Sequence, residues 1–165
     1  MKRLLWLVGP PAAGKSTGAE ALKELPHPPR ILELAQWLYP LMDTAKRRKG
    51  MMRAKGLLIQ AIRTVELEPA NGGLPPLVVI SAIQRDSELF PLSPEEEVLL
   101  LLPSRAQWEL QFLGRAPVHA PGSHPMNLEE ASGWYEHYLD WLEKGLPVRR
   151  LMSSKDLGVV IQELR

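Results

Sequence analysis

Residues 3–25 read RLLWLVGPPAAGKSTGAEALKEL, and this stretch changes character twice. The run Arg3–Val8 is short and apolar, which predicts a buried β-strand that ends at Gly9. The run Lys15–Leu25 contains helix-forming residues and stops at a proline-rich turn, which predicts a helix. Between the two lies GPPAAGKS, residues 9–16. The order is therefore strand, glycine-bearing loop, helix.

The loop satisfies the spacing G-x-x-x-x-G-K-[ST]. Its glycines permit a backbone path that turns successive N–H groups inward, and the following helix adds the positive end of its dipole. Such a loop predicts a site for the phosphates of a nucleotide, in which Lys15 spans the β- and γ-phosphates, Ser16 coordinates Mg²⁺ and Thr17 meets the α-phosphate. The predicted nucleotide-binding residues are Gly9, Pro10, Pro11, Ala12, Ala13, Gly14, Lys15, Ser16 and Thr17.

Strand-like and helix-like segments alternate along the rest of the chain. The expected strands are Arg30–Leu32, Leu77–Ile83, Val98–Leu102 and Val148–Met152. The expected helices are two or more within Trp37–Glu68, then Ser104–Leu113 capped by Ser104, Asn127–Lys144 capped by Asn127, and a last one capped by Ser153 or Ser154. This alternation predicts an α/β fold, a parallel sheet with helices on both faces, in one domain over residues 1–165.

Composition excludes several classes of site. The 165 residues contain no cysteine, which rules out disulfides, thiolate zinc sites and thiol nucleophiles. A net charge of +1 argues against a surface built wholesale for nucleic acid. The apolar run at the amino terminus is too short to span a membrane, so we expect a cytoplasmic protein with no membrane partner.

Beyond the loop, the sequence resembles the P-loop kinases, and three stretches resemble the adenylate-kinase branch of the nucleoside monophosphate kinases. Ser81-Ala82-Ile83-Gln84-Arg85 falls in the register of that branch's Asp-Gly-Phe-Pro-Arg pattern, Val98–Arg115 is similar to its strand, turn and lid-entry helix, and Val118–Ser123 is similar to the start of its lid. The resemblance implies a three-layer α/β/α fold with a five-stranded parallel sheet in the order 2-3-1-4-5. It also implies a short lid at about 115–126 and an acceptor-binding helical segment at about 36–68.

The resemblance assigns phosphate contacts to Arg85 and Arg115, which would neutralise the transferring phosphoryl group together with the catalytic Lys15. Three departures accompany it. Ser81 stands where the branch has the carboxylate that orders Mg²⁺, and Gln111 stands where an arginine stacks on adenine. The helix that begins at Leu128 lacks the paired catalytic arginines. Candidates for the missing carboxylate are Glu33, Asp43 and Asp86.

Several other residues have a functional and a structural interpretation. For Arg105 we favour an ordinary position on a helix surface over a role in catalysis. The basic run Lys46–Lys49 suits a solvated helix face, with a nucleic-acid or phosphate contact as the alternative. Trp134, Tyr138 and Trp141 share one helix face, which favours core packing. His119 and His124 flank a turn, and we interpret them as loop residues.

These observations predict an enzyme, an ATP-dependent (or GTP-dependent) and Mg²⁺-dependent P-loop kinase whose acceptor is a small molecule, preferably a nucleotide or nucleoside-like compound. Two alternatives remain open. A polynucleotide 5′-kinase would use Lys46–Lys49 to hold its acceptor strand. A nucleotide-dependent switch or slow ATPase would need no acceptor, as Ser81 and Gln111 suggest.

Overall fold

The computed structural model describes residues 4–33, 56–57, 59–64, 78–82, 89–114 and 127–164, of which 33, 78–82 and 164 are described by their backbone alone. The strands are β1 (Leu4–Val8), β2 (Arg30–Glu33), β3 (Val78–Ala82), β4 (Glu96–Leu101) and β5 (Val148–Leu151). The helices are α1 (Lys15–Leu22), α5 (Arg105–Gly114), α6 (Leu128–Glu143), the short 3₁₀ helix η1 (Ser154–Asp156) and α7 (Leu157–Leu164). Residues 59–64 are also helical.

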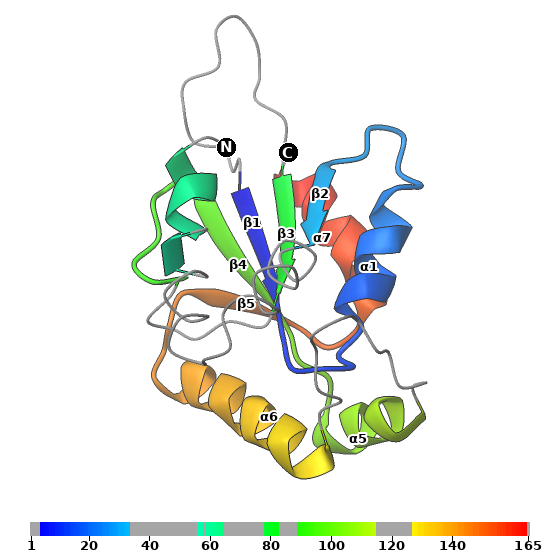
Figure 1. The fold of residues 1–165 in the computed structure, drawn as a ribbon. Coiled ribbons are helices and arrows are strands. Elements are labelled where there is room, and N and C mark those ends of the chain that lie inside the picture. Colours follow the sequence, from blue (N-terminus) through cyan, green and yellow to red (C-terminus); the bar gives the residue numbers. More distant parts are fainter. Residues whose placement is uncertain are drawn as a thin grey trace, which may run out of the picture.

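The described strands form one parallel sheet in the order β2-β3-β1-β4-β5, which agrees with the predicted order (Figure 1). The central strand β1 pairs with β3 on one side and β4 on the other. All five strands therefore end at the same edge of the sheet, from which the loop after Val8 leads into α1.

Helices cover both faces of the sheet, because alternate residues of β1 and β4 pack into two separate hydrophobic clusters. One cluster joins Trp6 and Leu100 to α5, α6 and the helical residues 59–64. The other joins Leu7 and Leu101 to α1 and α7. Strands β1 and β4 are thus buried on both faces, as expected for strands of a parallel sheet. Among the described residues, the architecture is the predicted three-layer α/β/α arrangement.

The helix ends follow local signals in the sequence. Asn127 accepts a hydrogen bond from the backbone N–H of Glu130 at 2.8 Å, as predicted for an N-cap. Ser104 accepts one from Gln107 at 3.3 Å, and Ser153 caps η1 by accepting one from Lys155 at 3.2 Å. Some helix ends differ from the prediction, since α1 ends at Leu22 and not at Leu25, and α5 ends at Gly114 and not at Leu113.

Strand β4 begins at Glu96, two residues before the predicted Val98. The buried carboxylate of Glu96 explains this, because three donors satisfy it: Trp6 Nε1 at 3.0 Å, Arg63 Nε at 2.7 Å and the backbone N–H of Ser93 at 2.7 Å. Arg63 also donates to the carbonyl oxygen of Leu89. Because these donors satisfy the buried carboxylate, β4 can begin at a glutamate inside the core.

The aromatic face of α6 packs into the core, as predicted. Tyr138 and Trp141 are fully buried and in contact, with ring centroids 4.8 Å apart, and Trp134 is half-buried beside Tyr138. Tyr135, which the sequence analysis did not single out, is buried on the same helix.

Candidate active site

The phosphate loop connects β1 to α1 at the edge where the strands end. Two of its residues have a positive φ angle, Ala12 at 62° and Gly14 at 105°. Gly14 is the N-cap of α1 and makes no side-chain cap, and the first turn of the helix contains no acidic residue. Since the first N–H groups of a helix have no acceptor within it, this end of α1 presents backbone donors and positive potential.

The ammonium group of Lys15 reaches back across the loop. Its Nζ donates to the carbonyl oxygens of Gly9 and Pro10, each at 2.8 Å. The backbone N–H of Ala13 donates to the same Pro10 oxygen at 3.2 Å. A lysine ammonium and a loop amide therefore converge on one oxygen atom of the loop, and charged and amide N–H donors of this kind also suit a phosphate oxygen.

Glycine is required where the loop meets the sheet. A Cβ atom added at Gly9 would lie 2.4 Å from the carbonyl oxygen of Leu101, far inside contact distance. A Cβ atom added at Gly18, one turn into α1, would lie 2.9 Å from Leu157 Cδ2 of α7. The loop and the start of α1 are thus pressed against β4 and α7.

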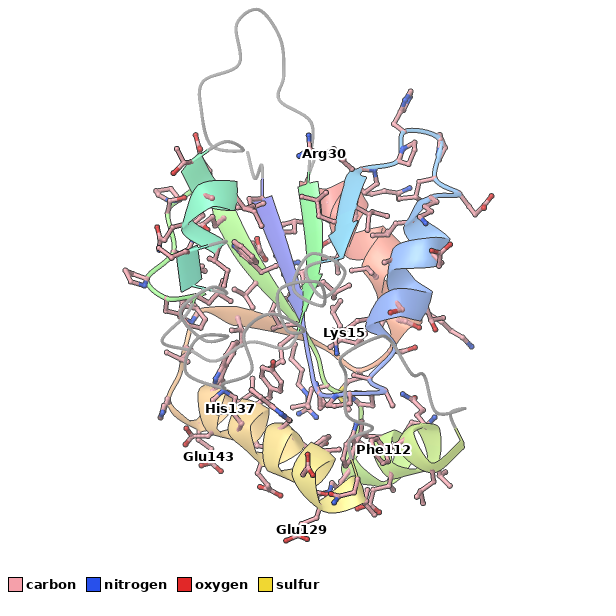
Figure 2. The ribbon with its side chains drawn as sticks, in the orientation of Figure 1. Lys15, Arg30, Phe112, Glu129, His137 and Glu143 are labelled. Carbon is pink, nitrogen blue, oxygen red and sulfur yellow. The ribbon has the colours of Figure 1, made fainter. Side chains whose placement is uncertain are left out.

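The loop forms the floor of a pocket of about 610 Å³. Ser16 and Thr17 are exposed on its wall, and Lys15 is half-buried there. Figure 2 shows Lys15 near the carboxyl ends of the strands, on the side of the molecule that also holds α5. The remaining lining residues come from the loop, from α5 and from the segment after β5: Ala12, Ala13, Gly14, Leu110, Gln111, Gly114, Ser153 and Ser154.

Two side chains of α5 contact the loop directly. Trp108 Nε1 donates to the carbonyl oxygen of Pro11 at 2.7 Å, and Gln111 Nε2 donates to that of Ala12 at 2.9 Å. Gln111, which stands at the position where the resemblance places an adenine-stacking arginine, is therefore bonded to the loop backbone in this structure.

The architecture matches solved structures over nearly the whole chain. Shikimate kinase from Bacteroides thetaiotaomicron aligns with a TM-score of 0.66 at 12% identity, covering 98% of this chain and 97% of that one. Shikimate kinase from Acinetobacter baumannii, solved with shikimate, aligns with a TM-score of 0.64 at 16% identity, covering 99% and 93%. Deoxyadenosine kinase from M. mycoides, solved with dATP, aligns with a TM-score of 0.57 at 13% identity, covering 97% of each chain.

The chain shares the fold of these kinases. The sequence matches no family profile and no curated protein. The fold agrees with the resemblance at the level of the P-loop kinases, whereas the adenylate-kinase branch remains a hypothesis.

Arg105 makes contacts that stabilise the packing of α5 against α6. Its guanidinium pairs with Glu109 and Glu136 and lies over the rings of Trp108 and Tyr135, 5.6 and 4.9 Å from their centroids. Burial opposes its charge, but the hydrogen bonds to the two carboxylates outweigh that effect and raise the pKa of Arg105. These contacts agree with the interpretation of Arg105 as a surface residue of the helix.

Other predicted site residues fall outside the described part of the chain. They are Arg85, Arg115, Asp43, Asp86, Lys46–Lys49, His119 and His124, together with the predicted lid at about 115–126 and most of the segment at about 36–68. Glu33 and Ser81 are described by their backbone and lie in register on adjacent strands, β2 and β3. Neighbouring strands are about 4.8 Å apart, so the backbone of one candidate residue lies beside that of Ser81.

Sequence reasoning missed one residue that contacts the loop and two that line the pocket. Trp108 gave no signal, because a tryptophan in an amphipathic helix is read as core. Ser153 or Ser154 was predicted to cap the last helix, and Ser153 caps η1, but both residues also line the pocket. No described helix is long and apolar enough to cross a membrane.

Proposed function

We propose that this protein is a kinase that transfers the γ-phosphoryl group of ATP or GTP to a small-molecule acceptor, with nucleotides and nucleoside-like compounds as the preferred class. The observation that carries the proposal is the convergence of Lys15 Nζ and the Ala13 N–H on one oxygen, at the head of α1 in a kinase fold. A phosphate oxygen carries charge and is a stronger acceptor than the carbonyl of Pro10. The nucleotide would replace that carbonyl as the partner of Lys15.

In this proposal, different residues of the loop bind different phosphates of the nucleotide. Lys15 and the loop amides hold the β- and γ-phosphates, because positive charge and aligned N–H groups stabilise the charge that develops during transfer. Thr17, exposed on the pocket wall, meets the α-phosphate. Phosphoryl transfer needs little covalent help from the protein, so alignment and charge are the main contributions.

Magnesium fits this donor set as an ion that arrives with the nucleotide. Among the described residues, no group of three or more histidines, cysteines or carboxylates could hold a metal ion alone. The hydroxyl of Ser16 is a hard oxygen ligand on the pocket wall, and Mg²⁺ commonly combines one or two protein oxygens with phosphate oxygens and water. When bound, Mg²⁺ neutralises charge on the β- and γ-phosphates. We assign Glu33, in register with Ser81, as the carboxylate that supports it.

Arg85 and Arg115 remain part of the proposal through the resemblance alone. Arg85 follows β3, which ends at the edge of the sheet where ligands of open α/β folds bind, and Arg115 follows α5, whose Gly114 lines the pocket. Their role would be to neutralise the transferring phosphoryl group.

A small-molecule acceptor is supported by the structures that share the fold. They are named for small acceptors, shikimate and deoxyadenosine, and one contains dATP. Since identity is 16% or lower, the fold carries over and the acceptor does not. The nucleoside-like class rests on the motifs quoted above.

The test is ADP release, measured by a coupled assay over a panel of nucleoside monophosphates, nucleosides and sugar acids. We expect at least one acceptor to raise turnover above background, and Lys15→Ala to lower it about 100-fold or more. Removal of Mg²⁺ with a chelator should abolish turnover. The exposed Lys23→Ala, at the end of α1, is the matched control and should retain activity.

Hydrolysis that no acceptor stimulates would overturn the kinase proposal and favour the switch or slow ATPase. Transfer only to the 5′ ends of single strands, with binding that weakens steeply with salt, would favour the polynucleotide kinase.

A further inference from the structure

Two neighbouring carbonyl groups of the phosphate loop are held from outside by α5. Trp108 Nε1 donates to the oxygen of Pro11 at 2.7 Å, and Gln111 Nε2 donates to the oxygen of Ala12 at 2.9 Å. The sequence separations are 97 and 99 residues, so these contacts belong to the tertiary structure. They fix two consecutive peptide units of the loop.

Fixing the carbonyl groups also fixes the amides. In a planar trans peptide the C=O and N–H groups point in opposite directions. With the Pro11 oxygen turned toward Trp108, the N–H of Ala12 is turned away from α5. With the Ala12 oxygen turned toward Gln111, the N–H of Ala13 is turned toward the Pro10 oxygen that Lys15 also contacts. The two bonds therefore set the direction of the N–H groups of Ala12 and Ala13.

One of these loop residues has a backbone that needs support. Ala12 has a φ angle of 62°, in the left-handed region that costs an L-residue with a Cβ atom about 1 kcal/mol or more. The bond from Gln111 ends on the carbonyl of this residue. This bond stabilises the turn in the conformation in which the Ala13 N–H donates to the Pro10 oxygen.

The Trp108 side of the contact is rigid. Trp108 is fully buried, with its ring centroid 5.0 Å from that of Tyr135 and 5.7 Å from that of Phe112. Tyr135 Oη in turn donates to the carbonyl oxygen of Pro103 at 2.6 Å. Gln111 receives a hydrogen bond from Gln107 at 3.1 Å, which orients its amide. The loop is therefore tied to a packed part of the core.

We propose that Trp108 and Gln111 are positioning residues, which hold the phosphate loop in its anion-binding shape through the carbonyl groups of Pro11 and Ala12. Neither side chain has to touch the phosphates for this role. The inference deepens the proposed function and rests on it in one respect, that the loop binds the phosphates of a nucleotide.

The test compares Trp108→Phe, which keeps an aromatic ring and removes the N–H donor, with Gln111→Met, which keeps the length and removes the amide. Calorimetry with MgATP should show dissociation constants raised at least about fivefold for each variant, with a larger increase for the double variant. The controls are Trp134→Phe on α6 and Gln162→Met, an exposed position on α7. Both controls should bind MgATP as the wild-type protein does.

Two further measurements separate positioning from general destabilisation. In the kinase assay, the KM for ATP should rise while the KM for the acceptor stays unchanged, which a loss of folded protein would not produce. MgATP should alter the tryptophan fluorescence of the wild-type protein and of Trp134→Phe, and this change should be lost in Trp108→Phe.

Each result has one meaning. Unchanged MgATP affinity in both α5 variants would overturn this inference and leave the proposed function intact. A wild-type protein that gives no heat with MgATP would overturn the proposed function, and this inference with it. Equal losses of affinity in the variants and the controls would also overturn the inference.

Discussion

The indole N–H of Trp6 donates to the buried carboxylate of Glu96 at 3.0 Å, across the pair of strands β1 and β4 at the centre of the sheet. Arg63, from the helical residues 59–64, donates to the same carboxylate and lies over the Trp6 ring, 5.4 Å from its centroid. The three side chains fasten a helix to the sheet on the face opposite α1 and α7. Glu96 is the first residue of β4, at the opposite end of that strand from the edge where the phosphate loop lies.

Replacing Glu96 with alanine should lower the free energy of unfolding by about 3–5 kcal/mol, because it leaves a largely buried guanidinium without its carboxylate partner and an indole N–H without an acceptor. The side chain of Glu96 is 2% exposed and that of Arg63 is 14% exposed. Denaturation in urea measures the change. The control is Glu163→Ala, which removes an ion pair to Arg149 whose glutamate is 60% exposed and should cost less than about 1 kcal/mol. Similar costs for the two variants would contradict the prediction.

Gly9→Ala should lower both stability and nucleotide affinity. The added methyl group would lie 2.4 Å from the Leu101 carbonyl oxygen, which belongs to the sheet backbone and cannot move aside easily. A cost of about 1–3 kcal/mol is typical of such overpacking, and the loop must shift to accept it. Denaturation and MgATP calorimetry on the same samples measure the two effects. Wild-type values in both would show that the loop is not pressed against β4.

Gly133→Ala is the opposite case, and we expect it to stabilise the protein by about 0.5–1 kcal/mol. Gly133 is exposed in the interior of α6, and an added Cβ atom would meet no atom within 4 Å. Alanine loses less conformational entropy than glycine when a helix forms. The midpoint of denaturation should rise while MgATP affinity stays constant. A lower midpoint would mean that α6 is not a regular helix at this position.

Position 12 should tolerate glycine but not a β-branched residue, as judged by stability and MgATP binding. Ala12→Gly relieves the left-handed strain but increases the entropy of the unfolded chain, so stability should change by less than about 1 kcal/mol and MgATP should still bind. Ala12→Val places a β-branched residue at a φ angle of 62°, which should cost about 1–3 kcal/mol and weaken binding. Calorimetry and denaturation of the pair provide the comparison. Normal binding by Ala12→Val would exclude the observed backbone conformation.

Tyr135 should make stability fall at alkaline pH. Burial raises the pKa of Tyr135, with a smaller contribution from Glu136, although Arg150 and Arg105 partly counteract the shift. Because the folded pKa lies above the unfolded value of about 10, the contribution is complete below pH 10 and is lost as the pH rises through the folded pKa. Tyr135→Phe should lose the hydrogen bond to Pro103, at a cost of about 1–2 kcal/mol at neutral pH.

Denaturation from pH 8 to pH 11 measures this dependence, and the profile of Tyr135→Phe should be flatter than that of the wild-type protein. Parallel profiles for the two proteins would show that Tyr135 does not titrate in this range.

Much of the fold could be predicted because its signals are local. The helix from Leu128 was recognisable from Asn127, whose side chain caps it, and from the spacing of Tyr138 and Trp141. The early start of β4 was not predictable, since a glutamate is ordinarily exposed. Its burial depends on Arg63 and Trp6, which lie 33 and 90 residues away along the chain.

The sequence by itself determined the phosphate loop, because a glycine at each end, a lysine and a hydroxyl at fixed spacing between a strand and a helix are all features of one short segment. Only the tertiary structure decided what surrounds that loop. Trp108 and Gln111 reach its carbonyl groups, and Ser154 lies against Gly14, because the strand order β1-β4-β5 brings the segments after β4 and β5 to the same edge. Contacts between residues about 100 positions apart follow from the packing of the sheet, which no local pattern records.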